Sequence, residues 1–273
     1  MYNDLFSVGP FTVHGYGLMI GLGVLAAVLW GGRRAKNHGR SDDFMISMAL
    51  WVIVFGFVGS KILFVITEWR SFLADPLSLL GSEGFVVYGG LIGGLLAAYI
   101  YCRVHHENIL EWLDYLVPGV ALAQAFGRVG CFLAGCCYGK ACDCAISVVF
   151  PAGSFAPAGV PLLPVQLFSA AGNLLICIAL LLLERRKKHH GFLLGCYFLL
   201  YSVGRFIIEF WRDDPRGTVG VLSTSQFIAI FGVIFSTALL RYLSRRPESL
   251  AAAETGEDAA GEDAEPTDKE KAE

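Results

Sequence analysis

The chain has 273 residues, of which 55% are hydrophobic and 16% charged, and its mean hydropathy is +0.58. Soluble domains are typically about 45–50% apolar, and here the excess lies in long blocks between short charged segments, which excludes a soluble globular protein. The net charge of −3 reflects residues 247–273, which are acidic, rich in alanine and free of aromatic side chains. That composition is typical of a disordered tail, and the rest of the chain is basic.

Seven segments are long enough to cross about 30 Å of hydrocarbon as helices. They are residues 16–32, 44–66, 85–102, 112–132, 164–183, 192–210 and 222–240. No basic stretch precedes the first segment and no small-residue cleavage site follows it, so we expect a retained helix and not a cleaved signal peptide. The sequence therefore predicts an all-α membrane protein with about seven transmembrane helices. Residues 1–246 would form one transmembrane domain and residues 247–273 a disordered acidic tail.

The basic residues of the connecting segments predict how the chain crosses the membrane. One side would carry Arg33, Arg34, Lys36, Arg40, Arg103, Arg185, Arg186, Lys187, Lys188, Arg241, Arg245 and Arg246, and the other Arg70, Lys140, Arg212 and Arg216. Short cytoplasmic loops carry an excess of lysine and arginine. We therefore expect the N-terminus outside and the C-terminal tail in the cytoplasm.

Few ionisable residues lie inside the predicted spans, and they are functional candidates because a charge facing lipid is costly. Arg205 and Glu209 are four positions apart on one helical face, so they form either a structural ion pair or part of a polar site. Arg128 has no charged residue three or four positions away, and it therefore needs an anion from elsewhere. Lys61 lies near the outer end of its span, where snorkelling explains it.

Two arginines in a membrane cavity suit a phosphate, because the planar guanidinium can bind two phosphate oxygens at once. Glycines around Arg128 would let the backbone and a lipid head group approach each other closely. The phosphate available in a membrane is that of a phospholipid. These residues therefore predict a protein that handles a phospholipid near the outer leaflet.

Six motifs, in chain order, resemble those of the prolipoprotein diacylglyceryl transferase family. The central one, GRVGCFLAGCCYG at residues 127–139, resembles the family signature Gly-Arg-x-Gly-Asn-Phe-x-Asn-x-Glu-x-x-Gly. The others are VHGYGLMIGLG at 13–23, YGGLIGG at 88–94, PVQLFSA at 164–170, GRFIIEFWR at 204–212 and LSTSQ at 222–226. Each motif is a weak signal alone, but the ordered set covers nearly all of the membrane part.

The resemblance implies seven transmembrane helices in the bacterial plasma (inner) membrane, with the N-terminus outside. It implies transfer of the diacylglyceryl group of phosphatidylglycerol to the lipobox cysteine thiol of a prolipoprotein, which forms a thioether and releases glycerol phosphate. No cofactor, metal or nucleic acid is expected. The implied site comprises Arg128 for the phosphate, Arg205 and Glu209 for catalysis, and Tyr16, Gly17, Gly89, Cys131 and Gln166 for substrate binding.

Four positions depart from the family pattern. Tyr88 replaces a histidine, Cys131 and Ala134 replace asparagines, and Cys136 replaces a glutamate. A phenol is a poor base near neutral pH, although Tyr88 can still donate a hydrogen bond or orient the peptide. The nearest alternative base is His14, at the outer start of the first span; the other reading of His14 is a solvated interfacial side chain.

Five cysteines fall within fourteen residues, at Cys131, Cys136, Cys137, Cys142 and Cys144. Three roles are open: small buried apolar side chains, a disulfide outside the cytoplasm, and a redox or metal site. Their odd number leaves at least one thiol free or paired with another chain, and their spacing is not a standard structural zinc pattern. The other cysteines, expected to pack within spans, are Cys102, Cys177 and Cys196.

Three functions remain open at this point. The first is the transferase, and the second is a relative on the same fold whose cysteines perform another thiol or metal chemistry. The replaced histidine and glutamate favour the second, whereas Arg128, Arg205 and Gln166 favour the first. The third is a small-solute transporter, which would have two related halves with paired broken helices; the sequence has no visible repeat of that kind.

Overall fold

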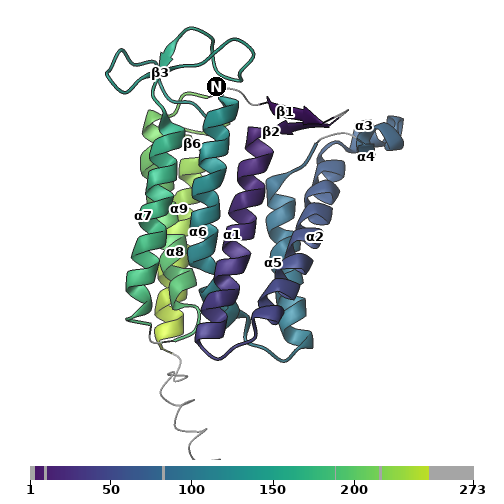
Figure 1. Cartoon of the computed structure of the whole chain (residues 1–273), viewed down its shortest axis with the longest axis vertical. Coiled ribbons are helices and arrows are strands. Elements are labelled where there is room, and N and C mark those ends of the chain that lie inside the picture. The colour runs from purple at the N-terminus through teal and green to yellow at the C-terminus, as the bar shows by residue number, and fades with distance from the viewer. Residues whose placement is uncertain (1–3, 9–10, 82–83, 188, 215–216, 246–273) are drawn as a thin grey trace, which may run out of the picture.

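The structure is a computed structural model, and it describes residues 4–8, 11–81, 84–187, 189–214 and 217–245. Long helices run side by side through the molecule (Figure 1). They are α1 Gly15–Asn37, α2 Asp42–Thr67, α5 Val87–Val104, α6 Ile109–Ala134, α7 Val165–Glu184, α8 Phe192–Ile208 and α9 Thr224–Ser244. With α8 extended by the 3-10 turn η1, Glu209–Trp211, seven helices within these described ranges are long and apolar enough to cross a membrane. The predicted all-α multi-pass fold is confirmed, while the predicted tail lies outside the described residues.

Two helices begin earlier than their apolar runs, because polar caps extend them. Helix α2 begins at Asp42, where the Ser41 side chain accepts a hydrogen bond from the Phe44 backbone N–H at 3.4 Å. Helix α6 begins at Ile109, and the Asn108 side chain accepts from the Leu110 N–H at 3.0 Å. A side-chain oxygen at these positions satisfies a backbone donor that the helix itself leaves free. Hydropathy alone therefore places both helix starts too late.

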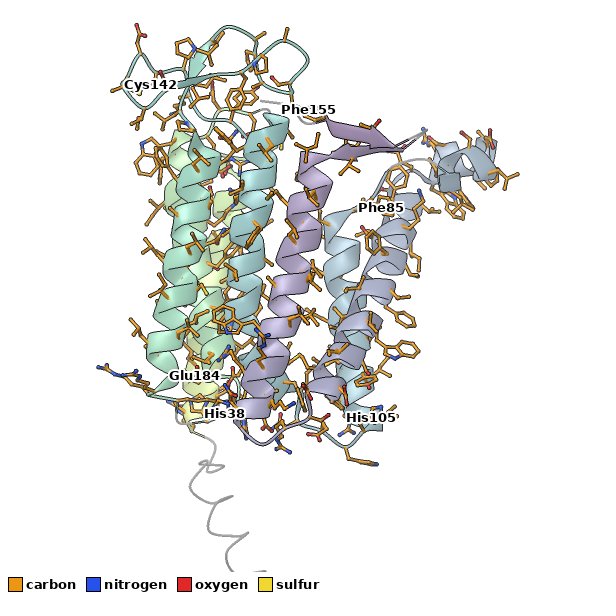
Figure 2. All side chains as sticks on the ribbon, viewed as in Figure 1. His38, Phe85, His105, Cys142, Phe155 and Glu184 are labelled. Atoms are coloured by element: carbon orange, nitrogen blue, oxygen red, sulfur yellow. A yellow bond between two sulfur atoms is a disulfide. The ribbon has the colours of Figure 1, made fainter. Side chains whose placement is uncertain are left out.

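Short elements gather at one end of the bundle (Figure 1). They are the hairpins β1 Asp4–Val8 with β2 Phe11–His14, β3 Val148–Val149 with β4 Pro161–Leu162, and β5 Thr218–Val219 with β6 Leu222–Ser223, and the helices α3 Trp69–Ala74 and α4 Pro76–Gly81. Between α6 and α7, residues 135–164 fold over this end around the buried side chains of Phe150, Ala156 and Leu162. We call this end of the helix bundle the cysteine end, because Cys142 lies there (Figure 2). Hydropathy did not predict these short elements.

Close backbone contact joins α6, the central helix, to α1. A Cβ placed on Gly119 would lie 2.9 Å from the Ala27 Cα, so only glycine fits without a shift of the helices. Small residues of this kind permit close approach in membranes. Large apolar side chains instead face outward, as on α2, where Leu50 and Trp51 are 59% and 51% exposed. Such a distribution suits a protein whose outer surface contacts lipid.

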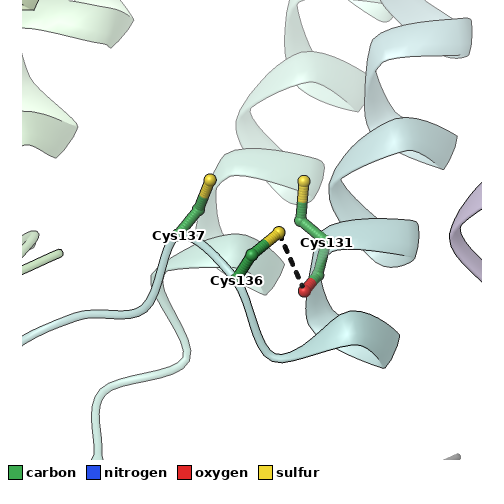
Figure 3. A group of neighbouring side chains, drawn as sticks. All are labelled: Cys131, Cys136 and Cys137. Atoms are coloured by element: carbon green, nitrogen blue, oxygen red, sulfur yellow. Dashed lines mark hydrogen bonds between the residues drawn. The ribbon is translucent and has the colours of Figure 1, made fainter. Parts of the chain in front are cut away.

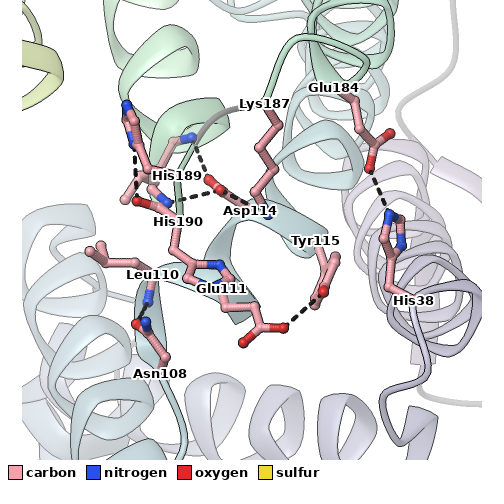
Figure 4. Close-up of polar contacts among 12 residues, drawn as sticks. His38, Asn108, Leu110, Glu111, Asp114, Tyr115, Glu184, Lys187, His189 and His190 are labelled. Carbon is pink, nitrogen blue, oxygen red and sulfur yellow. Dashed lines mark hydrogen bonds and ion pairs between the residues drawn. The ribbon is translucent and has the colours of Figure 1, made fainter. Parts of the chain in front are cut away.

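Helices α1, α5, α7 and α9 end at the opposite end of the bundle (Figures 1 and 2). The described residues among the twelve lysines and arginines predicted for the cytoplasmic side lie at this end. Lys188 and Arg246, and Arg216 of the smaller set predicted for the other side, fall outside the described residues. A buried network stabilises this basic end (Figure 4). The Asp114 carboxylate accepts from the Gly191 and Leu194 backbone N–H groups, each at 2.9 Å, and lies 3.3 Å from the Lys187 ammonium. The two ends thus differ in charge as predicted, whereas the direction of the chain across a membrane stays a prediction.

Candidate active site

Arg128 lies on α6, close to the cysteine end, and is half-buried. It interacts with the Tyr201 hydroxyl of α8 and with the thiols of Cys131 and Cys137. Within the ranges that the structure describes, no carboxylate forms an ion pair with Arg128. A guanidinium in this position retains capacity for an anionic ligand.

Arg205 and Glu209 do meet, as their spacing predicted. One guanidinium nitrogen of Arg205 lies 3.3 Å from a Glu209 carboxylate oxygen, and the same nitrogen donates to the Ser225 hydroxyl of α9 at 2.8 Å. The other terminal nitrogen, Nη1, is buried and has no hydrogen-bond partner among the described residues. Arg205 is therefore held in place from two sides and keeps one donor available.

Arg212 was counted in the sequence only as a loop charge, although it closes the quoted motif GRFIIEFWR. Its buried side chain forms a two-bond contact with Asp214, at 3.2 and 3.1 Å. The charges of Arg128 and Arg212 both act on Arg205. Three guanidinium groups therefore interact electrostatically at the cysteine end. Glu209 and Asp214 pair with two of them, so the charge of Arg128 is the one left for a phosphate ligand.

An open cavity of about 350 Å³ lies beside this group, bordered by Glu209 and Arg212. Lys140 and Gln226 also line it. Its polar rim is what a charged head group or a leaving phosphate requires. Of the three arginines only Arg212 lines the cavity, and Asp213 and Asp214 add acidic groups to its wall.

Tyr16, at the start of α1, lies near Arg128, as does Cys131, and both are predicted substrate contacts. Its hydroxyl interacts with Arg128 and with the nearby thiols. Packing is tight here, since a Cβ on Gly130 would lie 3.2 Å from the Tyr16 carbonyl oxygen. Gly17, one residue further, is exposed and has open space where a side chain would stand.

The α5 residues lie apart from this group. Helix α5 packs against α2, on the other side of α1 from α7, α8 and α9 (Figure 1). Tyr88 is 56% exposed there, and Gly89 lies in close contact with the Gly59 backbone of α2. His14 immediately precedes α1 and is exposed. The geometry gives Gly89 a packing role, and the substrate and catalytic roles of Gly89, Tyr88 and His14 stay predictions.

Gln166 holds the loop that follows α6. It is 1% exposed, and its side-chain amide donates to the Cys136 carbonyl at 2.8 Å. This contact could not be predicted from the sequence, because thirty positions separate the two residues. Gln166 therefore positions the cysteine loop, and its predicted contact with substrate stays a prediction.

The cysteines divide into three groups. Cys142 and Cys144 form a disulfide. Cys102, Cys177 and Cys196 are buried within helices, as expected of packing residues. The remaining three, Cys131, Cys136 and Cys137, are free, and their sulfur atoms all lie within 4.8 Å of one another (Figure 3). We call these three residues the three-thiol cluster.

Arginine charge acts on this cluster. Hydrogen bonds with the thiols of Cys131 and Cys136, together with the charges of Arg212 and Arg128, lower the pKa of Cys137. Thiolate is the form of cysteine that attacks carbon and binds metals. Of the three cysteines, Cys137 is therefore the one whose setting favours the thiolate form.

Comparisons with known proteins agree with this geometry. The sequence profile of the prolipoprotein diacylglyceryl transferase family matches residues 3–242. The chain is 45% identical to phosphatidylglycerol–prolipoprotein diacylglyceryl transferase 2 of Clostridium perfringens, over 81% of this chain and 88% of the relative. It is 44% identical to the corresponding transferase of Clostridium tetani, over 84% and 93%. A transferase of Dehalococcoides mccartyi is 34% identical over 88% and 93%. The chain therefore belongs to the prolipoprotein diacylglyceryl transferase family.

Proposed function

We propose that the protein transfers the diacylglyceryl group of phosphatidylglycerol to the lipobox cysteine thiol of a prolipoprotein. The observation that carries the proposal is Arg128, a guanidinium without a carboxylate partner in the described chain, beside Arg205 and Arg212 at one end of the helix bundle. Family membership and the names of the relatives support the two substrates. The uneven charge of the two ends supports a bacterial plasma membrane location, with the cysteine end outside.

The reaction requires charge stabilisation at the phosphate. The substrate sulfur attacks the glyceryl carbon that bears the phosphate, a C–S bond forms, and the C–O bond to the phosphate breaks. Glycerol phosphate leaves with the electron pair of that bond, and the thiol proton is released. The phosphodiester thereby becomes a monoester with more negative charge, and positive groups that are already in place stabilise that charge as it develops.

Each arginine has a role in this proposal that follows from its partners. Arg128 would bind the phosphate, because no carboxylate in the described chain occupies it. Arg205, fixed by Glu209 and Ser225, would offer its remaining donor to a phosphate oxygen. Arg212 is paired with Asp214 and would contribute its charge from the cavity wall. Tyr16 and Gly17 would border the lipid from α1.

Transfer in a defined bilayer tests the proposal. The purified chain is placed in vesicles that contain phosphatidylglycerol, and a synthetic lipobox peptide is added. We expect a peptide heavier by one diacylglyceryl group in mass spectrometry, and no such product with phosphatidylethanolamine or with a peptide whose cysteine is serine. Absence of the product with phosphatidylglycerol, from protein that remains folded and monodisperse, would refute the proposed function.

A further inference from the structure

Two members of the three-thiol cluster occupy positions at which this chain departs from the family signature. Cys131 and Cys136 stand where the family signature has asparagine and glutamate, and Tyr88 stands where it has histidine. The proposed reaction must remove a proton from the substrate thiol. The chain therefore lacks the family's histidine and glutamate at these positions and has three thiols beside the proposed phosphate site.

The end of α6 brings the first two thiols together. Gly135, at φ 76°, ends the helix in the left-handed conformation. The Cys136 N–H then donates to the Cys131 carbonyl at 3.1 Å and the Gly135 N–H to the Phe132 carbonyl at 3.2 Å, the two bonds of a Schellman motif. The Cys136 sulfur also lies 3.7 Å from the Cys131 carbonyl oxygen (Figure 3). Two cysteines five positions apart are thus held on the same side of the turn.

The third thiol is placed by an unusual backbone. Cys137 has φ 58°, a left-handed conformation that is uncommon for residues other than glycine, asparagine and aspartate. Such a conformation costs about 1–3 kcal/mol and concentrates at functional sites. The Gln166 amide secures the same loop through the Cys136 carbonyl, at 2.8 Å. A constrained, supported turn therefore directs three sulfur atoms toward one point.

The separation of the sulfur atoms fits a metal ion. Zinc binds thiolates at about 2.3 Å in tetrahedral sites, which places neighbouring sulfurs about 3.8 Å apart. Here the three sulfurs lie within 4.8 Å of one another, so small rotamer changes would complete the arrangement. Within the described residues no fourth histidine, cysteine or carboxylate joins the group. Three protein ligands and an open position are typical of catalytic zinc sites, whereas structural sites have four ligands.

From this geometry we infer that Cys131, Cys136 and Cys137 bind one Zn²⁺ ion whose open fourth position receives the substrate cysteine. The inference has two parts. The second part, that the incoming ligand is the substrate cysteine, rests on the proposed function. The first part, a zinc site in the three-thiol cluster, is argued only from the positions of the three sulfur atoms in the structure.

Zinc would supply the missing proton removal. A thiol that coordinates zinc is deprotonated outright, and its proton passes to solvent. The coordinated sulfur then attacks the glyceryl carbon, the C–O bond to the phosphate breaks, and glycerol phosphate leaves with its electron pair. The thioether product is a neutral and weaker ligand, so it leaves the zinc. Zinc undergoes no redox change, and no oxidant or reductant is needed.

The metal content of the purified chain tests whether the three-thiol cluster binds zinc. The chain is purified in detergent with a phosphine reductant and without chelator, and its metals are measured by plasma mass spectrometry. We expect about one zinc per chain, lost in Cys131→Ser, Cys136→Ser and Cys137→Ser and retained in Cys177→Ala. Cys177 is the matched control, because it is a buried thiol within α7. Less than stoichiometric zinc in all preparations, or copper or iron instead, would overturn the inference.

A measurement on the unmodified chain covers the case in which serine variants fail to fold. Replacement of zinc by Cd²⁺ should produce the ultraviolet thiolate-to-metal charge-transfer band, and thiol reagents should find the cluster protected until a chelator is added. A cluster that reacts freely and shows no such band refutes the site. Cluster thiols recovered as a disulfide under reducing purification would refute it too.

Transfer assays then separate the inference from the proposed function. Chelation of the wild-type chain should lower the rate of peptide lipidation by about 100-fold or more, the size of a lost acid–base function, and added Zn²⁺ should restore it. Full activity of zinc-free protein overturns the inference and leaves the proposed function intact. A stoichiometric zinc site in a chain that transfers no lipid overturns the proposed function and the role of the incoming thiol, and supports the metal site alone.

Discussion

Replacement of Arg128 is the most direct test of the phosphate site. A guanidinium bound to phosphate donates two charge-assisted hydrogen bonds, and each contributes about 1.5–3 kcal/mol. Arg128→Gln should therefore cost about 3–6 kcal/mol in transition-state stabilisation, or about 10²–10⁴-fold in kcat/KM for phosphatidylglycerol. Arg128→Lys keeps the charge but loses the planar fork, so it should cost about one such bond, or about 10–100-fold.

The assay is the initial rate of peptide lipidation in vesicles with varied phosphatidylglycerol content. Arg103→Gln is the matched control, because Arg103 is an exposed arginine at the basic end of α5, and its rate should equal that of wild type. Thermal unfolding in detergent checks that each variant remains folded. The reasoning is refuted if folded Arg128→Gln transfers lipid at a rate within about threefold of wild type, since that would leave less than one hydrogen bond to assign to Arg128.

Three further predictions concern pairing and packing. Single replacements Arg205→Gln and Glu209→Gln should each cost more than half of the double replacement in lipidation rate, because each strands a buried charge; strictly additive effects would contradict the 3.3 Å ion pair. Gly119→Val should lower the melting temperature in detergent by separating α1 from α6, whereas Gly21→Val, with open space at its Cβ, should not, and equal effects would argue against the close contact. Asp114→Asn should destabilise the fold by about 3 kcal/mol in denaturant titrations, because a buried carboxylate holds both an ammonium and two backbone donors; an unchanged midpoint would argue against that network.

The helices were predictable from the sequence because hydropathy and length alone decide which segments can cross a bilayer. The residues at which the helices begin and end were harder to predict. Asn108 and Ser41 act through single hydrogen bonds that start α6 and α2, and a hydropathy average does not register a cap. The hairpins at the cysteine end are short and lie among loop residues, where no periodic pattern is long enough to indicate a strand.

Within the candidate site, contacts on one helix were predictable and contacts between elements were not. Arg205 and Glu209 follow from an i, i+4 spacing. The approach of Arg212 to Arg205 depends on how the chain turns after α8, and the bond from Gln166 to Cys136 joins two elements thirty positions apart. The placement of Tyr88 on the α2–α5 side of α1 likewise depends on helix order, which spacing in the sequence does not encode.

The three-thiol cluster and Arg128 constrain each other through charge. Metal binding would make all three cysteines thiolates and so bring three negative charges near Arg128, where they could compete with a phosphate for its guanidinium. A bound Zn²⁺ cancels two of those charges, and the one that remains can be balanced by neighbouring arginine charge. The inferred zinc site and the proposed phosphate site are therefore compatible with each other, and a substrate thiol that loses its proton to the metal needs no separate base. If the inferred zinc site deprotonates the substrate thiol, transfer does not require a histidine at position 88, where this chain has Tyr88.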